Sequence, residues 1–205
     1  MTKDEARSAA GDARRGRKRP RVPRKVTRAS LENAALAYLA RFATTAKGLT
    51  EVLMRRVHRA AHHHGTDPAE GRALVDTIVV RYRDAGLIDD ATFAQARART
   101  LFARGVAVRA VVFRLRRKGV SDDDIAAAIA GLDPESGDSA DTRALDRAAA
   151  RALARRRRLG PWRRGPAGED TRTRDLAALA RAGFSYGIAR EVIDGAADDD
   201  TSAGR

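Results

Sequence analysis

The sequence of 205 residues contains no cysteine and few aromatic residues. The lack of cysteine excludes disulfide bonds, thiolate metal ligands and cysteine nucleophiles. Aromatic residues make up 4% of the chain and hydrophobic residues 43%, so the core has to consist mainly of Ala, Leu, Val and Ile. No apolar run approaches the roughly 20 residues that a transmembrane helix needs. No apolar segment follows the basic N-terminus as it would in a secretory signal. We therefore expect a cytoplasmic protein without a membrane segment.

Motifs of common enzymes are also missing. The sequence has no glycine-rich phosphate-binding loop and no dinucleotide-binding fingerprint. Nothing groups its Ser, His and Asp residues into a catalytic triad. His58 and His62 lie one helical turn apart, a spacing that can hold a metal ion, but no further carboxylate or cysteine completes such a site. We therefore expect no enzymatic activity, no metal site and no cofactor.

Positive charge is concentrated in two blocks of a chain whose formal net charge is +14. Residues 1–28 hold 11 basic and 3 acidic side chains, and residues 139–165 hold 9 and 2. A chain of this charge is typical of proteins that bind an anionic partner, most often a nucleic acid. The alternative is a general enrichment in arginine from a GC-rich genome, which explains the two blocks less well.

Both ends of the chain differ from the middle. Residues 1–28 are highly charged, contain Pro20 and Pro23 and lack aromatic residues, so we predict a disordered basic arm. We predict a disordered acidic tail over residues 196–205. Between them, apolar residues recur at helical spacing, and no window alternates as a strand would. The fold is therefore predicted to be all-α.

The stretch "GLIDDATFA", residues 86–94, contains two adjacent acids that could be catalytic or could mark the start of a helix. Gly86 and Gly119 stand where left-handed helix ends are expected, and Ser121 stands where a helix should begin. Acids are stabilising at the positive end of a helix dipole. We therefore interpret Asp89 and Asp90 as the N-cap and first turn of a helix.

The helical pattern repeats along the chain. "LRRKGV" at residues 115–120 corresponds to "LARAGF" at residues 179–184, an offset of 64 residues. This similarity predicts tandem three-helix repeats at residues 29–88, 89–135 and 139–195, stacked into an elongated curved array in which neighbours share core. We expect a monomer, because such repeats stack within one chain.

Basic residues recur on two of the predicted helices. One set has nearly four-residue spacing and only Asp141 and Asp146 nearby to offset its repulsion. It is the arginine stripe, which comprises Arg143, Arg147, Arg151, Arg155 and Arg158. The other set surrounds Phe113 and comprises Arg109, Arg114, Arg116, Arg117 and Lys118. We predict that both sets bind a phosphate backbone or an acidic protein surface. For each set the alternative is a solvated helix face.

Several stretches together resemble the RecX family over about residues 31–195. They are "ALAYLARFATTAKGLTEVL", "GLIDDATFA", "RLRRKGV" and "LARAGFSYGIAREVI", in this order. The resemblance implies a helical regulator without catalytic activity. Such a regulator binds the RecA filament on single-stranded DNA and inhibits its ATPase, strand exchange and co-protease activity, in recombinational repair and the SOS response. It also implies direct DNA contacts in some members.

A second hypothesis follows from the basic residues themselves. Short three-helix units can place a helix in a DNA groove, so the chain could be a stand-alone DNA-binding module. No short helix carries Asn or Gln beside Arg in an obvious base-reading set, so this binding would not be sequence-specific.

Overall fold

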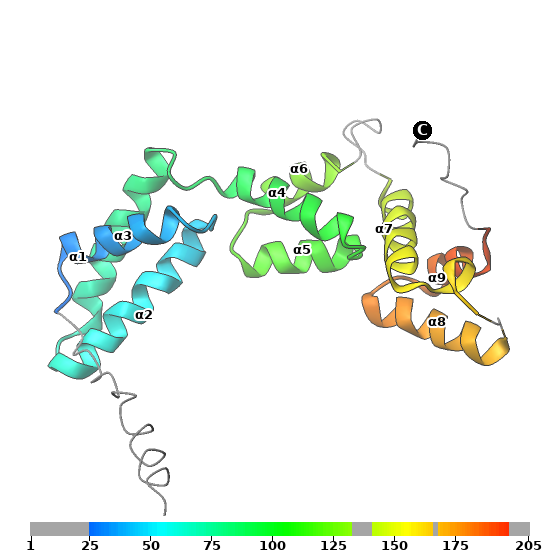
Figure 1. The fold of residues 1–205 in the computed structure, drawn as a ribbon. Coiled ribbons are helices and arrows are strands. Elements are labelled where there is room, and N and C mark those ends of the chain that lie inside the picture. The colour runs from blue at the N-terminus through cyan, green and yellow to red at the C-terminus, as the bar shows by residue number, and fades with distance from the viewer. Residues whose placement is uncertain (1–24, 133–140, 166–167, 197–205) are drawn as a thin grey trace, which may run out of the picture.

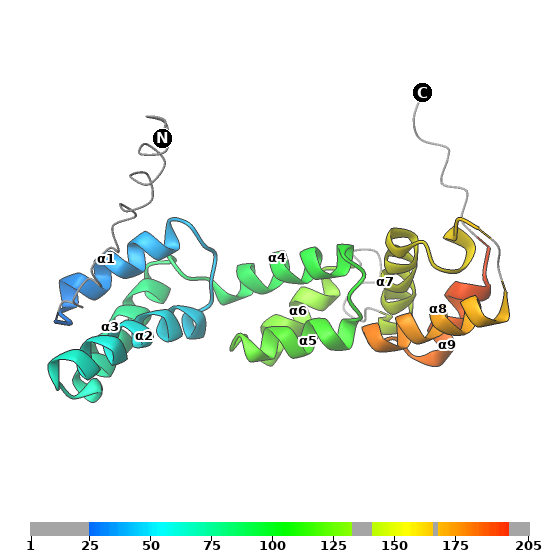
Figure 2. The same ribbon diagram turned by 60° about the horizontal axis from the view of Figure 1, so that its bottom comes forward.

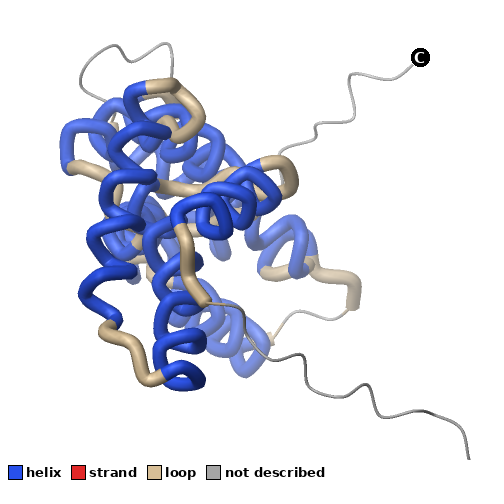
Figure 3. The backbone as a smooth tube through the Cα atoms, turned by 90° about the vertical axis from the view of Figure 1, so that its left-hand side faces the viewer, coloured by secondary structure: helices blue, strands red, loops and turns tan. Residues whose placement is uncertain are grey.

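The computed structural model of the chain describes residues 25–132, 141–165 and 168–196, and these consist of helices and connecting loops without a strand (Figure 3). The predicted all-α fold is confirmed. Most of the predicted arm and tail lie outside the described residues. Arg28, which we had assigned to the arm, is instead the first residue of α1, because the Thr27 side chain accepts a hydrogen bond from the Ser30 amide and caps this helix.

Nine α-helices and one short 3₁₀ helix make up the described part of the chain. They are α1 (Arg28–Leu39), α2 (Ala46–His64), α3 (Pro68–Asp84), α4 (Asp90–Ala103), α5 (Val108–Arg117), α6 (Asp122–Ala130), α7 (Thr142–Arg157), η1 (Gly160–Trp162), α8 (Glu169–Ala182) and α9 (Tyr186–Asp194).

The helices form three successive groups, each around its own apolar cluster. The first repeat is α1–α3, the second is α4–α6, and the third is α7–α9 with η1. Figures 1 and 2 show the repeats end to end in an elongated array, with the second repeat at the top of a shallow arch in Figure 1.

The second and third repeats share the local features that their sequence similarity predicts. Leu115 and Leu179 are both fully buried, and burial of a leucine contributes about 1.5–3 kcal/mol. Gly119 and Gly183 have φ of 81° and 105°, a left-handed conformation that glycine adopts without a steric penalty. The serine two residues after each glycine caps the last helix of its repeat. The correspondence at an offset of 64 residues is therefore confirmed.

The paired acids after α3 have structural partners. Asp89 is the N-cap of α4, and its carboxylate accepts hydrogen bonds from the Thr92 amide at 2.8 Å and the Thr92 hydroxyl at 2.6 Å. These bonds lower the pKa of Asp89 below its ordinary value. Asp90 accepts a hydrogen bond from the Ala46 amide at the start of α2, at 2.8 Å. The interpretation as helix starts is confirmed, and Asp90 has a second role that joins the first repeat to the second.

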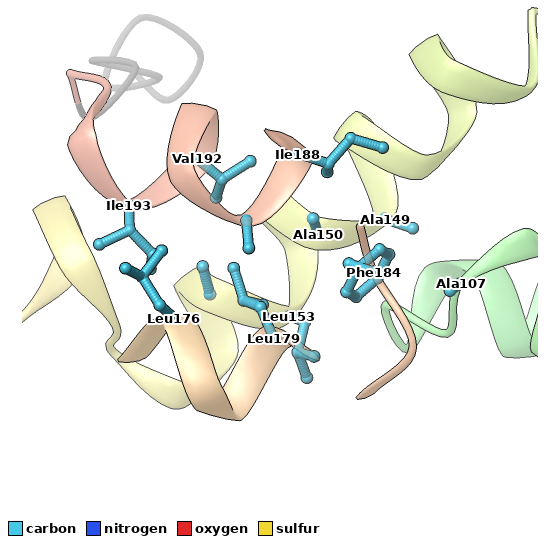
Figure 4. Packing of buried hydrophobic residues seen from close by; sticks show 12 residues of the cluster. Ala107, Ala149, Ala150, Leu153, Leu176, Leu179, Phe184, Ile188, Val192 and Ile193 are labelled. Carbon is cyan, nitrogen blue, oxygen red and sulfur yellow. The ribbon is translucent and has the colours of Figure 1, made fainter. Parts of the chain in front are cut away.

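The second and third repeats are joined in a similar way. An oxygen of Asp146 in α7 accepts a hydrogen bond from the Val108 amide at the start of α5, at 2.7 Å. Ala107, which precedes α5, is fully buried in the apolar cluster of the third repeat, and Figure 4 shows it on the Phe184 side of this cluster. In each case an aspartate from the first helix of one repeat binds the start of the second helix of the preceding repeat.

Candidate partner-binding surface

The basic residues on α5 form one of the two candidate surfaces. Arg109, Phe113 and Arg116 lie within about 60° of one another around the helix, because each residue adds about 100°. Phe113 is 61% exposed, and the Arg117 guanidinium lies 5.9 Å from the centre of its ring. We call these four residues the α5 patch. An exposed aromatic ring among arginines can contact an apolar group and an anion at the same time.

The other two basic residues predicted on α5 lie apart from the patch. Arg114 is about 140° around the helix from Arg109, and Lys118 about 180°. Lys118 is the C-cap of α5, and its carbonyl oxygen accepts a hydrogen bond from the Thr45 hydroxyl at 2.7 Å. Sequence spacing placed these residues near the patch, but the helix directs their side chains elsewhere.

The patch is partly neutralised and partly fixed in position by its neighbours. Arg116 forms an ion pair with Asp122 of α6, with 2.8 Å between Nε and the carboxylate oxygen. The Arg109 side chain passes over the turn between α8 and α9, where its Nε would lie 3.2 Å from a Cβ atom on Gly183. Arg109 therefore extends from the second repeat onto the third.

The arginine stripe on α7 forms the second candidate surface. Residues four apart are separated by about 400° around a helix, so the stripe turns by about 120° from Arg143 to Arg155. At its start, Arg143 and Arg147 face α9, where Glu191 lies 3.7 Å from the first and 2.6 Å from the second. Further along, Arg151 and Arg155 are exposed. The stripe is therefore a winding surface with one end against an acidic side chain.

The acids near the stripe have backbone partners. Asp141 accepts a hydrogen bond from the Arg143 amide at the start of α7, and Asp146 accepts one from the Val108 amide at the start of α5. Glu191, which sequence spacing could not identify, compensates two of the arginines. Arg158 does not continue the stripe, since α7 ends at Arg157 and Arg158 is its left-handed C-cap with φ of 55°.

The junction between the second and third repeats brings α5 and α7 into contact. Asp146 binds the first amide of α5 and is the immediate neighbour of Arg147 in the stripe. Because that junction is packed and hydrogen-bonded, the α5 patch and the stripe are held in a fixed relation. A partner that extends along the array could contact both.

Other kinds of site are not formed by the described residues. Within residues 25–132, 141–165 and 168–196, no three His, Cys, Asp or Glu side chains come together as metal ligands would. No helix in these ranges has the length and apolar character needed to cross a bilayer. The fold and its surface thus define a tandem helical-repeat protein that presents cationic helix faces.

Comparisons with known proteins identify the family. A family model described as "RecX, second three-helix domain" matches residues 89–129. A regulatory protein RecX from Myxococcus xanthus is 43% identical over 192 residues, covering 93% of this chain and 97% of that protein. Another, from Thermobifida fusca, is 36% identical over 121 residues, covering 58% of this chain and 60% of that protein. The chain therefore belongs to the RecX family of regulatory proteins.

Solved structures have the same fold. A crystal structure of regulatory protein RecX aligns with a TM-score of 0.56 at 23% identity, covering 82% of this chain and 72% of that one. The structure of RecX from Lactobacillus salivarius aligns with a TM-score of 0.53 at 20% identity, covering 82% and 94%. The tandem three-helix arrangement is thus found in other members of the family.

Proposed function

We propose that this protein is a non-catalytic regulator that binds the RecA filament on single-stranded DNA and inhibits its ATPase, strand exchange and co-protease activity. Membership in the RecX family supports a regulatory role. The observation that carries the filament proposal is the contact between α5 and α7, which presents two cationic surfaces along an elongated array. A filament offers a repeated partner surface and an anionic strand along its length, so both surfaces could bind at once.

The α5 patch and the exposed part of the stripe are the proposed contacts. Arginine binds carboxylates and phosphates through two parallel hydrogen bonds, which suits either component of a filament. Arg143 and Arg147 contribute less net charge than the sequence suggests, because Glu191 lies beside them. We assign the main contacts to Arg109, Arg117, Arg151 and Arg155, because their side chains are exposed on these two surfaces.

The alternative function is non-specific DNA binding without RecA. The exposed ring of Phe113 beside Arg117 favours it, because such a pair can also stack on an unpaired base. The two functions differ in stoichiometry. A regulator that caps or bridges a filament acts at far less than one molecule per RecA, whereas a competitor for DNA has to cover the strand.

RecA ATPase on single-stranded DNA, measured with substoichiometric protein, tests the proposal. We expect inhibition by the natural chain and a clear loss of inhibition for Arg109→Gln/Arg117→Gln and for Arg151→Gln/Arg155→Gln. The matched control is Arg97→Gln/Arg99→Gln, which removes two exposed charges from α4 and should inhibit normally. Inhibition that requires coverage of the strand would favour the DNA-binding alternative, and equal inhibition by all variants would show that these surfaces are not the site.

A further inference from the structure

The first repeat contains a groove that belongs to neither basic surface described above. It runs between α1, with the turn that follows it, and the middle of α2, and it encloses about 890 Å³. These helices lie at the opposite end of the array from α7 (Figures 1 and 2). Ala34, Ala37 and Val52 contribute small apolar side chains to its wall, so the groove is open along its length. We call it the α1–α2 groove.

Aromatic rings line one end of the groove. Tyr38 and Phe42 lie with their ring centres 5.1 Å apart, and the Arg41 guanidinium is 5.2 Å from the centre of the Phe42 ring. Phe42 is 47% exposed and belongs to no apolar cluster of the described residues. An exposed ring of this kind gives a planar surface on which another ring can stack.

Arginines line the rest of the groove, and no acidic side chain of the described residues does so. Arg55, Arg56 and Arg59 lie on one face of α2 at spacings of three and four residues, where like charges repel one another. In α7 the same spacing is compensated by Glu191. On α2 none of the three forms an ion pair with an acid in the described ranges. The groove is therefore cationic and suited to an anionic ligand.

We propose that the α1–α2 groove binds an unpaired nucleic acid strand. Guanidinium groups bind phosphates through paired hydrogen bonds, and an exposed aromatic ring stacks on a base that has no partner strand. A duplex presents its phosphates but hides its base faces, so the aromatic end favours a single strand. An acidic helix would also match the charge. Its apolar face would, however, meet a wall of mainly small side chains, in which Leu53 is the largest aliphatic residue and is fully buried.

This proposal goes beyond the proposed function, since it assigns a separate binding site to the first repeat, at the opposite end of the molecule from the stripe (Figure 1). The test uses the full chain and fluorescence anisotropy with a labelled oligothymidylate, without RecA. Phe42→Ala should weaken binding by about fivefold to 150-fold, the range that corresponds to about 1–3 kcal/mol of stacking. It should leave the affinity for a duplex and the salt dependence unchanged, because the ring carries no charge.

A charge variant separates stacking from phosphate contacts. Arg55→Gln/Arg59→Gln should lower the slope of log affinity against log salt by about 1.4, since each phosphate contact on a single strand contributes about 0.7. Arg97→Gln/Arg99→Gln removes the same charge from α4 and should leave the slope unchanged. All substituted side chains are exposed, so circular dichroism and thermal unfolding should show an unchanged fold.

Two results would overturn the proposal. One is an unchanged affinity for oligothymidylate in Phe42→Ala. The other is that Arg55→Gln/Arg59→Gln loses its affinity for a labelled acidic peptide but keeps its affinity for oligothymidylate, which would show that the groove binds peptides. Because the assay contains no RecA, either failure leaves the filament proposal intact, and a failure of the filament proposal does not affect this one.

Discussion

The junction between the first and second repeats is polar, whereas the junction between the second and third includes an apolar core. At the first junction, the Thr45 hydroxyl donates to the carbonyl of Lys118 at 2.7 Å, and Asp90 accepts from the Ala46 amide at 2.8 Å. The Lys47 side chain lies over Gly119. The apolar cluster of the first repeat ends with Ile88, before α4 begins.

At the second junction, residues before α5 enter the third repeat. Ala107 is part of its apolar cluster, and Phe102 packs against the same cluster. A Cβ atom on Gly105 would lie 2.6 Å from the backbone nitrogen of Leu153 and 2.7 Å from the carbonyl oxygen of Ala149. The backbones of the two repeats therefore meet without a side chain between them.

This difference indicates where the array is stiff. Apolar burial and close backbone contact resist separation, whereas a junction held by a few part-buried hydrogen bonds without an apolar core opens more easily. We therefore expect the second and third repeats to move as one unit and the first repeat to move more easily relative to them. The proposed filament surfaces lie on the stiff unit, and the α1–α2 groove lies on the other.

The largest effect is expected from Gly105→Ala. Its φ of 67° costs a non-glycine residue about 1–2 kcal/mol, and the methyl group would collide with the backbone of α7, which adds about 1–3 kcal/mol. Gly86→Ala is the control, because φ there is 69° but no atom lies within 4 Å of the added carbon. Urea unfolding should show a loss about two to three times larger for Gly105→Ala. Equal losses would show that the second junction is not tightly packed.

Replacement of the bridging aspartate should also cost more stability at the second junction than at the first. Val108 is buried, and α5 has no side-chain cap of its own, so Asp146→Ala leaves a buried amide without an acceptor at a cost of about 1–3 kcal/mol. Ala46 is only half-buried, and Thr45 also caps α2, so Asp90→Ala should cost about 0.5–1.5 kcal/mol. The free energies of unfolding of the two variants test this order. A greater loss for Asp90→Ala would reverse the assignment of the stiff junction.

Thr45→Val tests the polar junction alone. The Thr45 side chain is fully buried, and its hydroxyl both accepts from the Gly48 amide at 3.0 Å and donates to Lys118. Valine keeps the shape and removes both bonds, which should cost about 1–2 kcal/mol. Thr45→Ser keeps the hydroxyl and loses one buried methyl group, about 0.8 kcal/mol. Hydrogen exchange should accelerate at the start of α2 in the valine variant and much less in the serine variant.

Local features of the fold could be predicted because their causes are local. A helix cap needs only a hydroxyl or carboxylate and an amide two or three residues later, so Asp89 and Ser121 were identified correctly. The left-handed glycines Gly86 and Gly119 were identified for the same reason. Apolar spacing then gave the class of fold and its repeated units.

Contacts between helices could not be predicted, since spacing specifies a face and not what lies against it. The bond from Ala46 to Asp90 joins residues 44 apart, and the bond from Val108 to Asp146 joins residues 38 apart. The buried carboxylate of Asp175, which accepts from the Gly160 amide at 2.8 Å and pairs with Arg163, gave no signal in the sequence. For the candidate site, the basic residues were predicted, but Glu191 beside the stripe was not.

The smallest expected effect is a loss of stability at acidic pH, which we compare for one ion pair at each end of the array. Asp194 accepts two hydrogen bonds from Arg172 at 2.7 Å each, and these lower the pKa of Asp194 below its ordinary 3.8. In the first repeat, Arg28 and then Arg81 lower the pKa of Glu32 below its ordinary 4.5. A carboxylate with a lowered pKa stabilises the fold fully above its unfolded value, and this contribution is lost as pH falls through the folded value.

Asp194→Asn and Glu32→Gln each remove one of these contributions. At neutral pH the natural chain should therefore be more stable than either variant, and this advantage should shrink on acidification below the ordinary pKa of the carboxylate that was replaced. The differences should be small, because both carboxylates are accessible to water, which screens such pairs. Melting temperatures from about pH 6 to about pH 3, a range that brackets both ordinary pKa values, measure them. If the first repeat is the more loosely attached unit, Glu32→Gln should change the unfolding of that repeat alone, and Asp194→Asn should change the second and third together. Acid unfolding of all three repeats in one step in every variant would argue against two mechanically separate units.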